Sequence, residues 1–88
     1  MAEACVEVDG IPVSVDPERL QTIEFLELIG EMDDSVAAAP KAMRYVLGDE
    51  QYANVKRSLR RDGMTRAVDV VTFFTKVIDA LGEQAKNS

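Results

Sequence analysis

The spacing of apolar residues near the C-terminus is the feature that most limits how this chain can fold. Apolar side chains recur there every three or four positions, which places them on one face of a helix: Ala67, Val70, Val71, Phe74, Val77, Ile78 and Leu81. Many residues of the segment are β-branched and favour a strand by propensity. The helical period nevertheless holds for about four turns, which is longer than a typical strand. We therefore predict an amphipathic helix over residues 67–81, with Gly82 as its stop.

The segment that follows residue 15 begins with a strong helix-start signal. In Asp16-Pro17-Glu18, the aspartate is an N-cap candidate, the proline occupies the first helical position and the glutamate lies near the positive end of the helix dipole. The apolar pattern predicts that this first helix runs from residue 17 to about Met32.

Glycines and capping residues divide the middle of the chain into two more helices. Ser35 is expected to cap a helix over residues 36–47, with Pro40 within or just past its first turn. Gly48 is its expected stop, and a third helix is expected over residues 50–61. Asp62-Gly63 ends that helix, and Thr65 is the expected cap of the last one.

The N-terminal residues predict a β-hairpin. Valines alternate with polar residues on both sides of Asp9-Gly10, a favoured two-residue hairpin turn because both positions tolerate positive φ. Pro12 cannot donate to a strand ladder and implies an edge strand or a very short strand. Because an isolated hairpin is marginal in water, it must lie on the helices, pair with another chain or be partly disordered.

The length of 88 residues corresponds to a single domain with a thin core. We predict a mostly α fold: a small, irregular, orthogonal bundle of about four helices with a short N-terminal β-hairpin. The expected division is a hairpin or arm over residues 1–15, a helical domain over 16–82 and a frayed tail over 83–88.

Composition argues against most enzyme chemistry. The chain has no His and a single Cys, so the commonest general base and the usual zinc clusters are missing. We therefore expect no catalytic activity, no metal and no cofactor. Cys5 is expected to be an incidental thiol, and a lone cysteine suits a reducing compartment.

Charge and hydropathy also limit which kinds of partner the chain is expected to bind. A net charge of −6 disfavours non-specific binding to nucleic acid or to an anionic membrane. The chain begins with an acidic, polar stretch rather than a secretory signal, and it lacks a run of ~18 apolar residues. We expect a cytoplasmic protein without membrane or nucleic-acid partners.

The first predicted helix carries more apolar surface than an ordinary surface helix. Four acidic residues form one narrow stripe: Glu24, Glu27, Glu31 and Asp34. Apolar residues cover more than half of the remaining circumference, so the helix either packs on two sides or offers one side to a partner. Glu27 and Glu31 are close enough on a helix to share a metal ion, but we favour a solvated acidic face.

Charge is distributed unevenly along the sequence. Residues 1–34 contain ten acidic residues and one basic residue, whereas residues 35–88 contain nine basic and six acidic residues. A basic patch forms on the third predicted helix from Lys56, Arg57, Arg60 and Arg61. Three interpretations remain open: attraction within the fold, head-to-tail self-association or a partner of complementary charge, and a plain solvated face.

Ser35 suggests one alternative function. Asp34-Ser35-Val36 opens a helix in a small acidic chain and is similar to the Asp-Ser-Leu motif of acyl carrier proteins, in which the serine carries phosphopantetheine. The helix that follows carries Lys41 and Arg44, where carrier proteins are acidic. We favour Ser35 as an ordinary N-cap, with the carrier and a generic helical adaptor kept as alternatives.

The order of several short motifs resembles the tail assembly chaperones of long-tailed bacteriophages, which are small acidic helical proteins. The resemblance covers roughly residues 6–81. Its motifs, in order, are Phe25-Leu26-Glu27-Leu28, an Asp-rich break, Ala39-Pro40-Lys41, Val46-Leu47-Gly48-Asp49-Glu50-Gln51-Tyr52, Lys56 and Asp62-Gly63.

This resemblance implies a non-enzymatic function. Such chaperones bind the long, helical tape measure protein, keep it soluble during tail tube assembly and are absent from the mature virion. The expected location is therefore the host cell cytoplasm, and weak homo-oligomers are expected along a long client. The predicted partner-binding residues are apolar or basic: Phe25, Leu28, Met32, Tyr52 and Phe73, with Lys56, Arg57, Arg60 and Arg61. Core packing remains the alternative for each apolar one.

Overall fold

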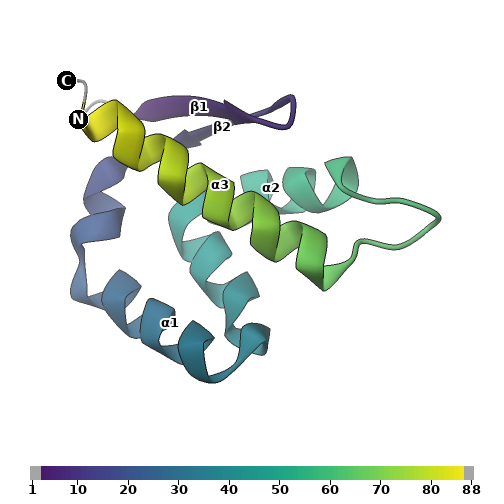
Figure 1. The fold of residues 1–88 in the computed structure, drawn as a ribbon, viewed down its shortest axis with the longest axis horizontal. Coiled ribbons are helices and arrows are strands. Elements are labelled where there is room, and N and C mark those ends of the chain that lie inside the picture. The colour runs from purple at the N-terminus through teal and green to yellow at the C-terminus, as the bar shows by residue number, and fades with distance from the viewer. Residues whose placement is uncertain (1–2, 87–88) are drawn as a thin grey trace.

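Two strands, three α-helices and two short 3-10 helices form the described part of the chain, residues 3–86, in a computed structural model (Figure 1). In chain order they are β1 (Ala4–Val8), β2 (Ile11–Val15), η1 (Pro17–Gln21), α1 (Ile23–Asp34), η2 (Val36–Ala38), α2 (Ala39–Ser58) and α3 (Ala67–Lys86). The mostly helical class with an N-terminal hairpin is as predicted.

The hairpin lies on the helices. β1 and β2 pair antiparallel with Val6 opposite Val13, and positive φ angles at Asp9 and Gly10 form the predicted tight turn. The inward-facing side chains of Val6, Val8, Ile11, Val13 and Val15 are buried. β1 packs on α3, and β2 packs on α2 (Figure 1). The first of the three alternatives for the hairpin is therefore the observed one, because burial of these valines supplies the stability that an isolated hairpin lacks.

The first predicted helix is divided in two. Asp16 caps only the short η1, with its carboxylate accepting from the backbone N–H of Glu18, and the chain is extended at Thr22. The Thr22 hydroxyl oxygen then caps α1 by accepting from the Phe25 N–H at 3.1 Å. The prediction of one helix from residue 17 was wrong, because Thr22 also hydrogen-bonds the Tyr45 hydroxyl at 2.7 Å and that tertiary contact holds the break.

Gly48 separates two helical halves of α2, as its predicted role of helix stop requires. Its φ of 83° and ψ of 159° are non-helical, so the direction of the chain changes there. Pro40 lies in the first turn, where proline is tolerated. Ser35 caps η2 rather than α2 itself, since its Oγ accepts from the Ala37 N–H.

α3 forms where helical spacing and β-branched propensity conflict, and it ends later than predicted. It continues through Gly82 to Lys86, and the Gln84 side chain donates to the Cys5 carbonyl at 2.8 Å. The Thr65 hydroxyl donates to the Lys56 carbonyl instead of capping α3. Of the predicted frayed tail, residues 83–86 are thus helical, and residues 87–88 lie outside the described residues.

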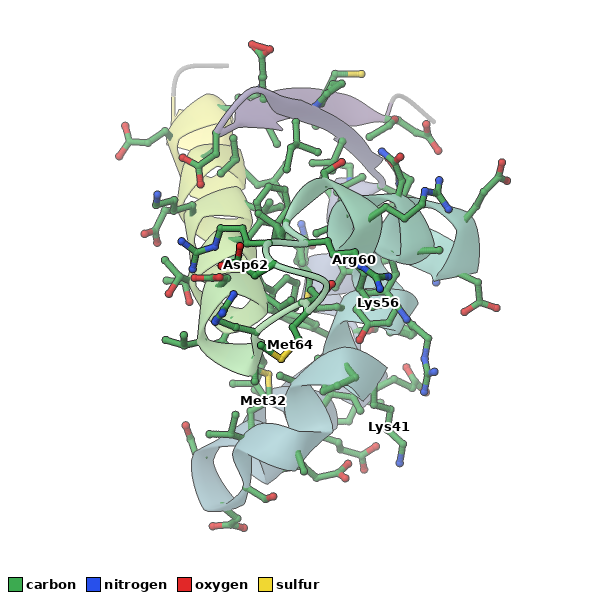
Figure 2. All side chains as sticks on the ribbon, turned by 90° about the vertical axis from the view of Figure 1, so that its right-hand side faces the viewer. Met32, Lys41, Lys56, Arg60, Asp62 and Met64 are labelled. Atoms are coloured by element: carbon green, nitrogen blue, oxygen red, sulfur yellow. The ribbon has the colours of Figure 1, made fainter. Side chains whose placement is uncertain are left out.

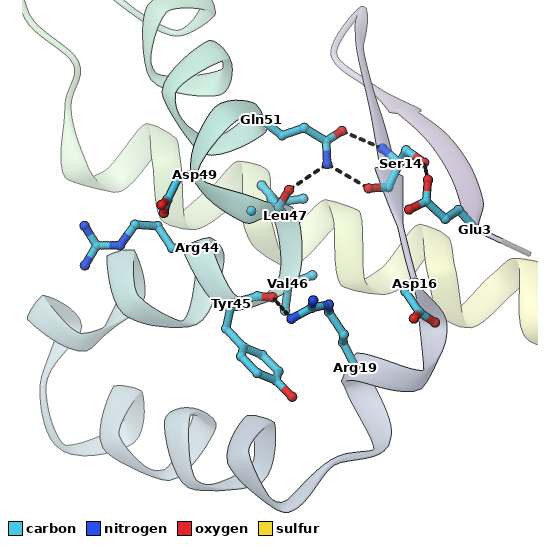
Figure 3. Close-up of a pocket in the computed structure, with 11 residues that line it drawn as sticks. Glu3, Ser14, Asp16, Arg19, Arg44, Tyr45, Val46, Leu47, Asp49 and Gln51 are labelled. Carbon is cyan, nitrogen blue, oxygen red and sulfur yellow. Dashed lines mark hydrogen bonds between the residues drawn. The ribbon is translucent and has the colours of Figure 1, made fainter. Parts of the chain in front are cut away.

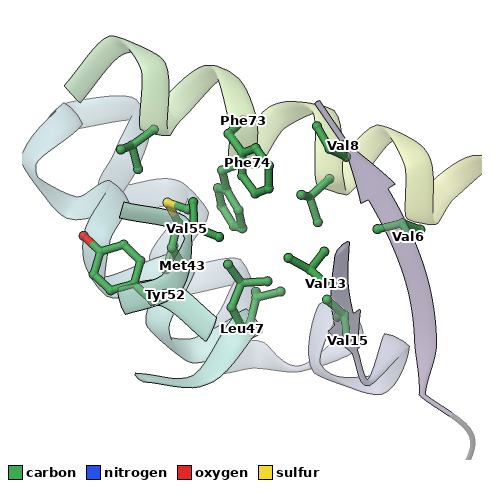
Figure 4. Close-up of a cluster of buried hydrophobic side chains, with 14 of the residues drawn as sticks. Val6, Val8, Val13, Val15, Met43, Leu47, Tyr52, Val55, Phe73 and Phe74 are labelled. Carbon is green, nitrogen blue, oxygen red and sulfur yellow. The ribbon is translucent and has the colours of Figure 1, made fainter. Parts of the chain in front are cut away.

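The core lies between the hairpin, α2 and α3 (Figure 4). The largest fully buried side chains come from these elements: Val15, Met43, Val55, Phe73, Phe74 and Val77. By contrast, α1 packs on α2, η1 and η2, and Leu28 is its one buried residue among those described. α1 is therefore a peripheral helix, which leaves part of its apolar surface uncovered.

Candidate protein-binding surface

An uncovered apolar strip runs along α1. Leu28 is only 9% exposed and packs in the core, whereas Ile23 and Leu26 are 61% and 64% exposed. Helical spacing places Ile23, Leu26, half-buried Ile29 and Gly30 on adjacent positions of one side. We call these four residues the α1 flank. The flank lies between the buried side of α1 and its acidic stripe, so the helix has three distinct faces.

The predicted apolar partner residues do not all lie on this surface. Leu28, Tyr52 and Phe73 are buried in the core, while Phe25 and Met32 are half-buried against it. Phe73 is buried together with Phe74 because α3 packs on both the hairpin and α2, which requires a wide apolar arc. Ile23 and Leu26, the large exposed apolar residues of the flank, were not among the predicted partner-binding residues, although they belong to the same apolar arc of α1.

The acidic stripe of α1 is solvent-facing. Glu24, Glu27, Glu31 and Asp34 are exposed, and Glu31 lies 3.9 Å from the Lys41 ammonium. Within the described residues, no group of three or more possible ligands is placed to hold a metal ion. The exposure of the four carboxylates fits the solvated acidic face favoured from the sequence.

The four basic residues predicted as a patch differ in how they are paired. Arg61 forms an ion pair with Asp69 at 2.7 Å, and Arg57 donates to the Asn54 side-chain oxygen at 3.3 Å. The Lys56 ammonium lies over the Tyr52 ring, 4.6 Å from its centre. Among the described side chains, no carboxylate forms an ion pair with Lys56, Arg57 or Arg60. Lys56 and Arg60 lie on the same side of the molecule (Figure 2), so much of their positive charge remains available to a partner.

An apolar groove opens beside this patch. It has a volume of about 370 Å³ and lies between the η2–α2 corner, the second half of α2 and the start of α3. We call it the α2–α3 groove; it is lined by Val36, Ala37, Ala39, Pro40, Tyr52, Lys56, Thr65, Ala67, Val70 and Val71. Lys56 and Thr65 also border the neighbouring hollow formed with Arg57 and Arg60, so the apolar groove and the cationic patch are continuous.

A second hollow, near the bend of α2, is polar and has mixed charge (Figure 3). Most of its polar groups contact other residues of the same domain. The Gln51 amide bonds the Ser14 backbone, and Arg19 donates to the Tyr45 carbonyl at 3.1 Å while its guanidinium lies over the Tyr45 ring. We assign this hollow a structural role, which the sequence did not reveal because the contacts join distant segments.

Ser35 and Cys5 are both exposed. The Ser35 hydroxyl oxygen caps η2, in agreement with the capping role favoured from the sequence. Cys5 lies on the solvent-facing side of β1, and its thiol is 3.8 Å from the Ser14 hydroxyl. Neither residue lies in the α2–α3 groove.

The fold and its surfaces define a small helical protein with two apolar surfaces, one of them bordered by cations. No protein-family model matches the chain, and comparisons with curated proteins and with solved structures give no match. In the described part of the chain, none of the helices is both long enough and apolar enough to cross a membrane.

Proposed function

We propose that this protein is a non-enzymatic tail assembly chaperone of the long-tailed bacteriophage type, which binds the tape measure protein and keeps it soluble during tail tube assembly. The proposal combines the order of motifs along the chain with the surface of α1. It places the protein in the host cell cytoplasm during assembly and outside the mature virion.

The observation that carries the proposal is the exposure of the α1 flank. Ile23 and Leu26 are large apolar side chains, each more than 60% exposed on one side of a helix that packs on the rest of the domain through its opposite side. An apolar strip on a helix is suited to cover a matching strip on another helix. A long helical client exposes such strips until it is assembled, and covering them prevents aggregation.

The proposed binding mode does not require the domain to unfold. The core formed by the hairpin, α2 and α3 is independent of the α1 flank, so a client helix can lie along α1 while the buried residues stay in place. A single domain of this size covers only a short stretch of a long client. We therefore propose that several copies bind along it and associate weakly with one another.

The test is co-expression with the tape measure protein encoded in the same genome. We expect the client to be soluble and to co-purify with the wild-type chain, and Leu26→Asp to abolish co-purification while circular dichroism stays helical. Val68→Asp is the matched control, because Val68 is also exposed (68%) but lies on α3. Equal co-purification by wild type and Leu26→Asp would remove the α1 flank as the client site, and an insoluble client in every case would overturn the chaperone function.

A further inference from the structure

We infer that the α2–α3 groove is a docking site for an acidic, amphipathic helical segment of a partner protein, separate from the α1 flank. The inference does not depend on the identity of the client proposed above. It rests on the apolar floor of the groove and on the cations along its edge.

The α2–α3 groove is lined mainly by apolar side chains. Tyr52, Val70 and Ala39 are buried and form its floor, whereas Val36 is 62% exposed at its rim. Pro40 and Val71 are half-buried at its sides. A segment that inserted apolar side chains here would cover surface that is otherwise in contact with water.

Tyr52 adds a polar group to the floor. Its ring is buried, its hydroxyl is directed away from the core (Figure 4), and it has no hydrogen-bond partner among the described residues. The Lys56 ammonium is held over the same ring at 4.6 Å. A carboxylate at the groove could therefore accept from the hydroxyl and pair with the ammonium.

The charge around the groove selects the sign of the partner. Lys56 lines the groove, Arg57 and Arg60 border the adjoining hollow, and none of the three is neutralised by a carboxylate among the described side chains. This local cationic edge belongs to a chain whose net charge is −6. Acidic side chains flanking an apolar strip would be attracted to this edge, whereas basic ones would be repelled by it.

The probe for the test is a labelled, designed helical peptide of about 15 residues with leucines at helical spacing and glutamates on both sides of the strip. A second peptide has lysine at every glutamate position. Binding of both to the full chain is measured by fluorescence anisotropy at low and at physiological salt. Amide chemical-shift changes then locate the bound peptide on the protein.

We expect the acidic peptide to bind at least tenfold more tightly than the basic one at low salt, with the difference shrinking as salt screens the charges. Shift changes should centre on residues 36–40 and 65–71. Lys56→Glu should weaken binding about tenfold, and Val36→Glu should weaken it at both salt concentrations. Lys41→Glu changes the net charge by the same amount outside the groove and should leave affinity within about twofold of wild type.

Several outcomes would overturn the inference. They are equal affinity for the two peptides, an equal loss of acidic-peptide affinity in Lys41→Glu and Lys56→Glu, or amide chemical-shift changes confined to α1. Sedimentation that shows a dimer dispersed by Val36→Glu would make a second copy of this chain the occupant. If anionic vesicles bind in a way that depends on Lys56 while the peptides do not bind, the occupant of the groove would be a lipid surface. Because the assay contains no tape measure protein, these results leave the proposed chaperone function untouched.

Discussion

The side-chain amide of Gln51 hydrogen-bonds both polar groups of the Ser14 backbone. Its oxygen accepts from the Ser14 N–H at 2.8 Å, and its nitrogen donates to the Ser14 carbonyl at 2.7 Å (Figure 3). The same nitrogen donates to the Leu47 carbonyl at 2.7 Å, next to the break at Gly48. One side chain thus joins β2 to the bend of α2 and fixes how the hairpin docks.

Gln51→Ala should destabilise the domain by about 1–3 kcal/mol, because it leaves half-buried backbone groups of Ser14 without partners. Urea denaturation followed by circular dichroism measures the change. The control is Glu50→Ala, an exposed neighbour in the same helix, which should change stability by less than about 0.5 kcal/mol. Similar values for the two variants would show that the Gln51 contacts contribute little.

Gly48→Ala and Gly30→Ala should have opposite effects on stability. A Cβ at either position would meet nothing within 4 Å, so any difference comes from the backbone. At Gly48, with φ 83° and ψ 159°, alanine should lower the free energy of unfolding by about 1–3 kcal/mol, because a side chain strains this backbone conformation. At Gly30, inside α1, alanine should stabilise by about 0.4–1 kcal/mol. Denaturation midpoints of the two variants on opposite sides of wild type are the expected result, and a stabilised Gly48→Ala would contradict the kink.

Leu28→Asp and Leu26→Asp should differ strongly in stability, because one leucine is buried and the other is exposed on the same helix. Leu28 is buried, so an unpaired carboxylate there should cost at least about 3 kcal/mol and lower the melting temperature strongly. Leu26 is 64% exposed, and its variant should stay within about 1 kcal/mol of wild type. Thermal melts monitored by circular dichroism at 222 nm test the pair, since a single small domain is expected to unfold in one transition. Two equally unstable variants would mean that the α1 flank is covered.

The ion pair between Lys76 on α3 and Asp9 in the hairpin turn should contribute little. Its atoms are 3.2 Å apart, but both side chains are about half exposed, so water and salt screen the attraction. A double-mutant cycle with Lys76→Ala and Asp9→Ala should give a coupling energy below about 1 kcal/mol that falls further as salt is added. A larger, salt-independent coupling would indicate that the pair positions the hairpin on α3.

Local signals in the sequence predicted the elements that depend on nearby residues. The Asp9-Gly10 turn, the break at Gly48 and the helical face of α3 each follow from a few neighbouring positions. The start of α1 at Ile23 and its cap at Thr22 were missed, because the Thr22 hydroxyl also meets Tyr45, a residue distant along the chain. The end of α3 was missed for a similar reason: beyond Gly82, the Gln84 side chain donates to the carbonyl of Cys5, a residue distant along the chain.

The candidate surfaces were predicted only in outline. The sequence showed that α1 has more apolar surface than one packing face requires, and it showed the run of cations from Lys56 to Arg61. It did not show that Leu28 points into the core while Leu26 points out, nor that Arg61 is paired with Asp69 while Arg60 is not.

The sequence by itself determined which segments are helices, where the hairpin turns and how charge is divided along the chain, because propensity, periodicity and turn geometry act over a few residues. Only the tertiary structure decided which side of α1 is covered. It alone also decided that the η2–α2 corner, the second half of α2 and the start of α3 enclose an apolar groove lined in part by Lys56. Those outcomes depend on the angles at which helices pack and on which surfaces meet, and both are set by contacts between residues far apart in the chain.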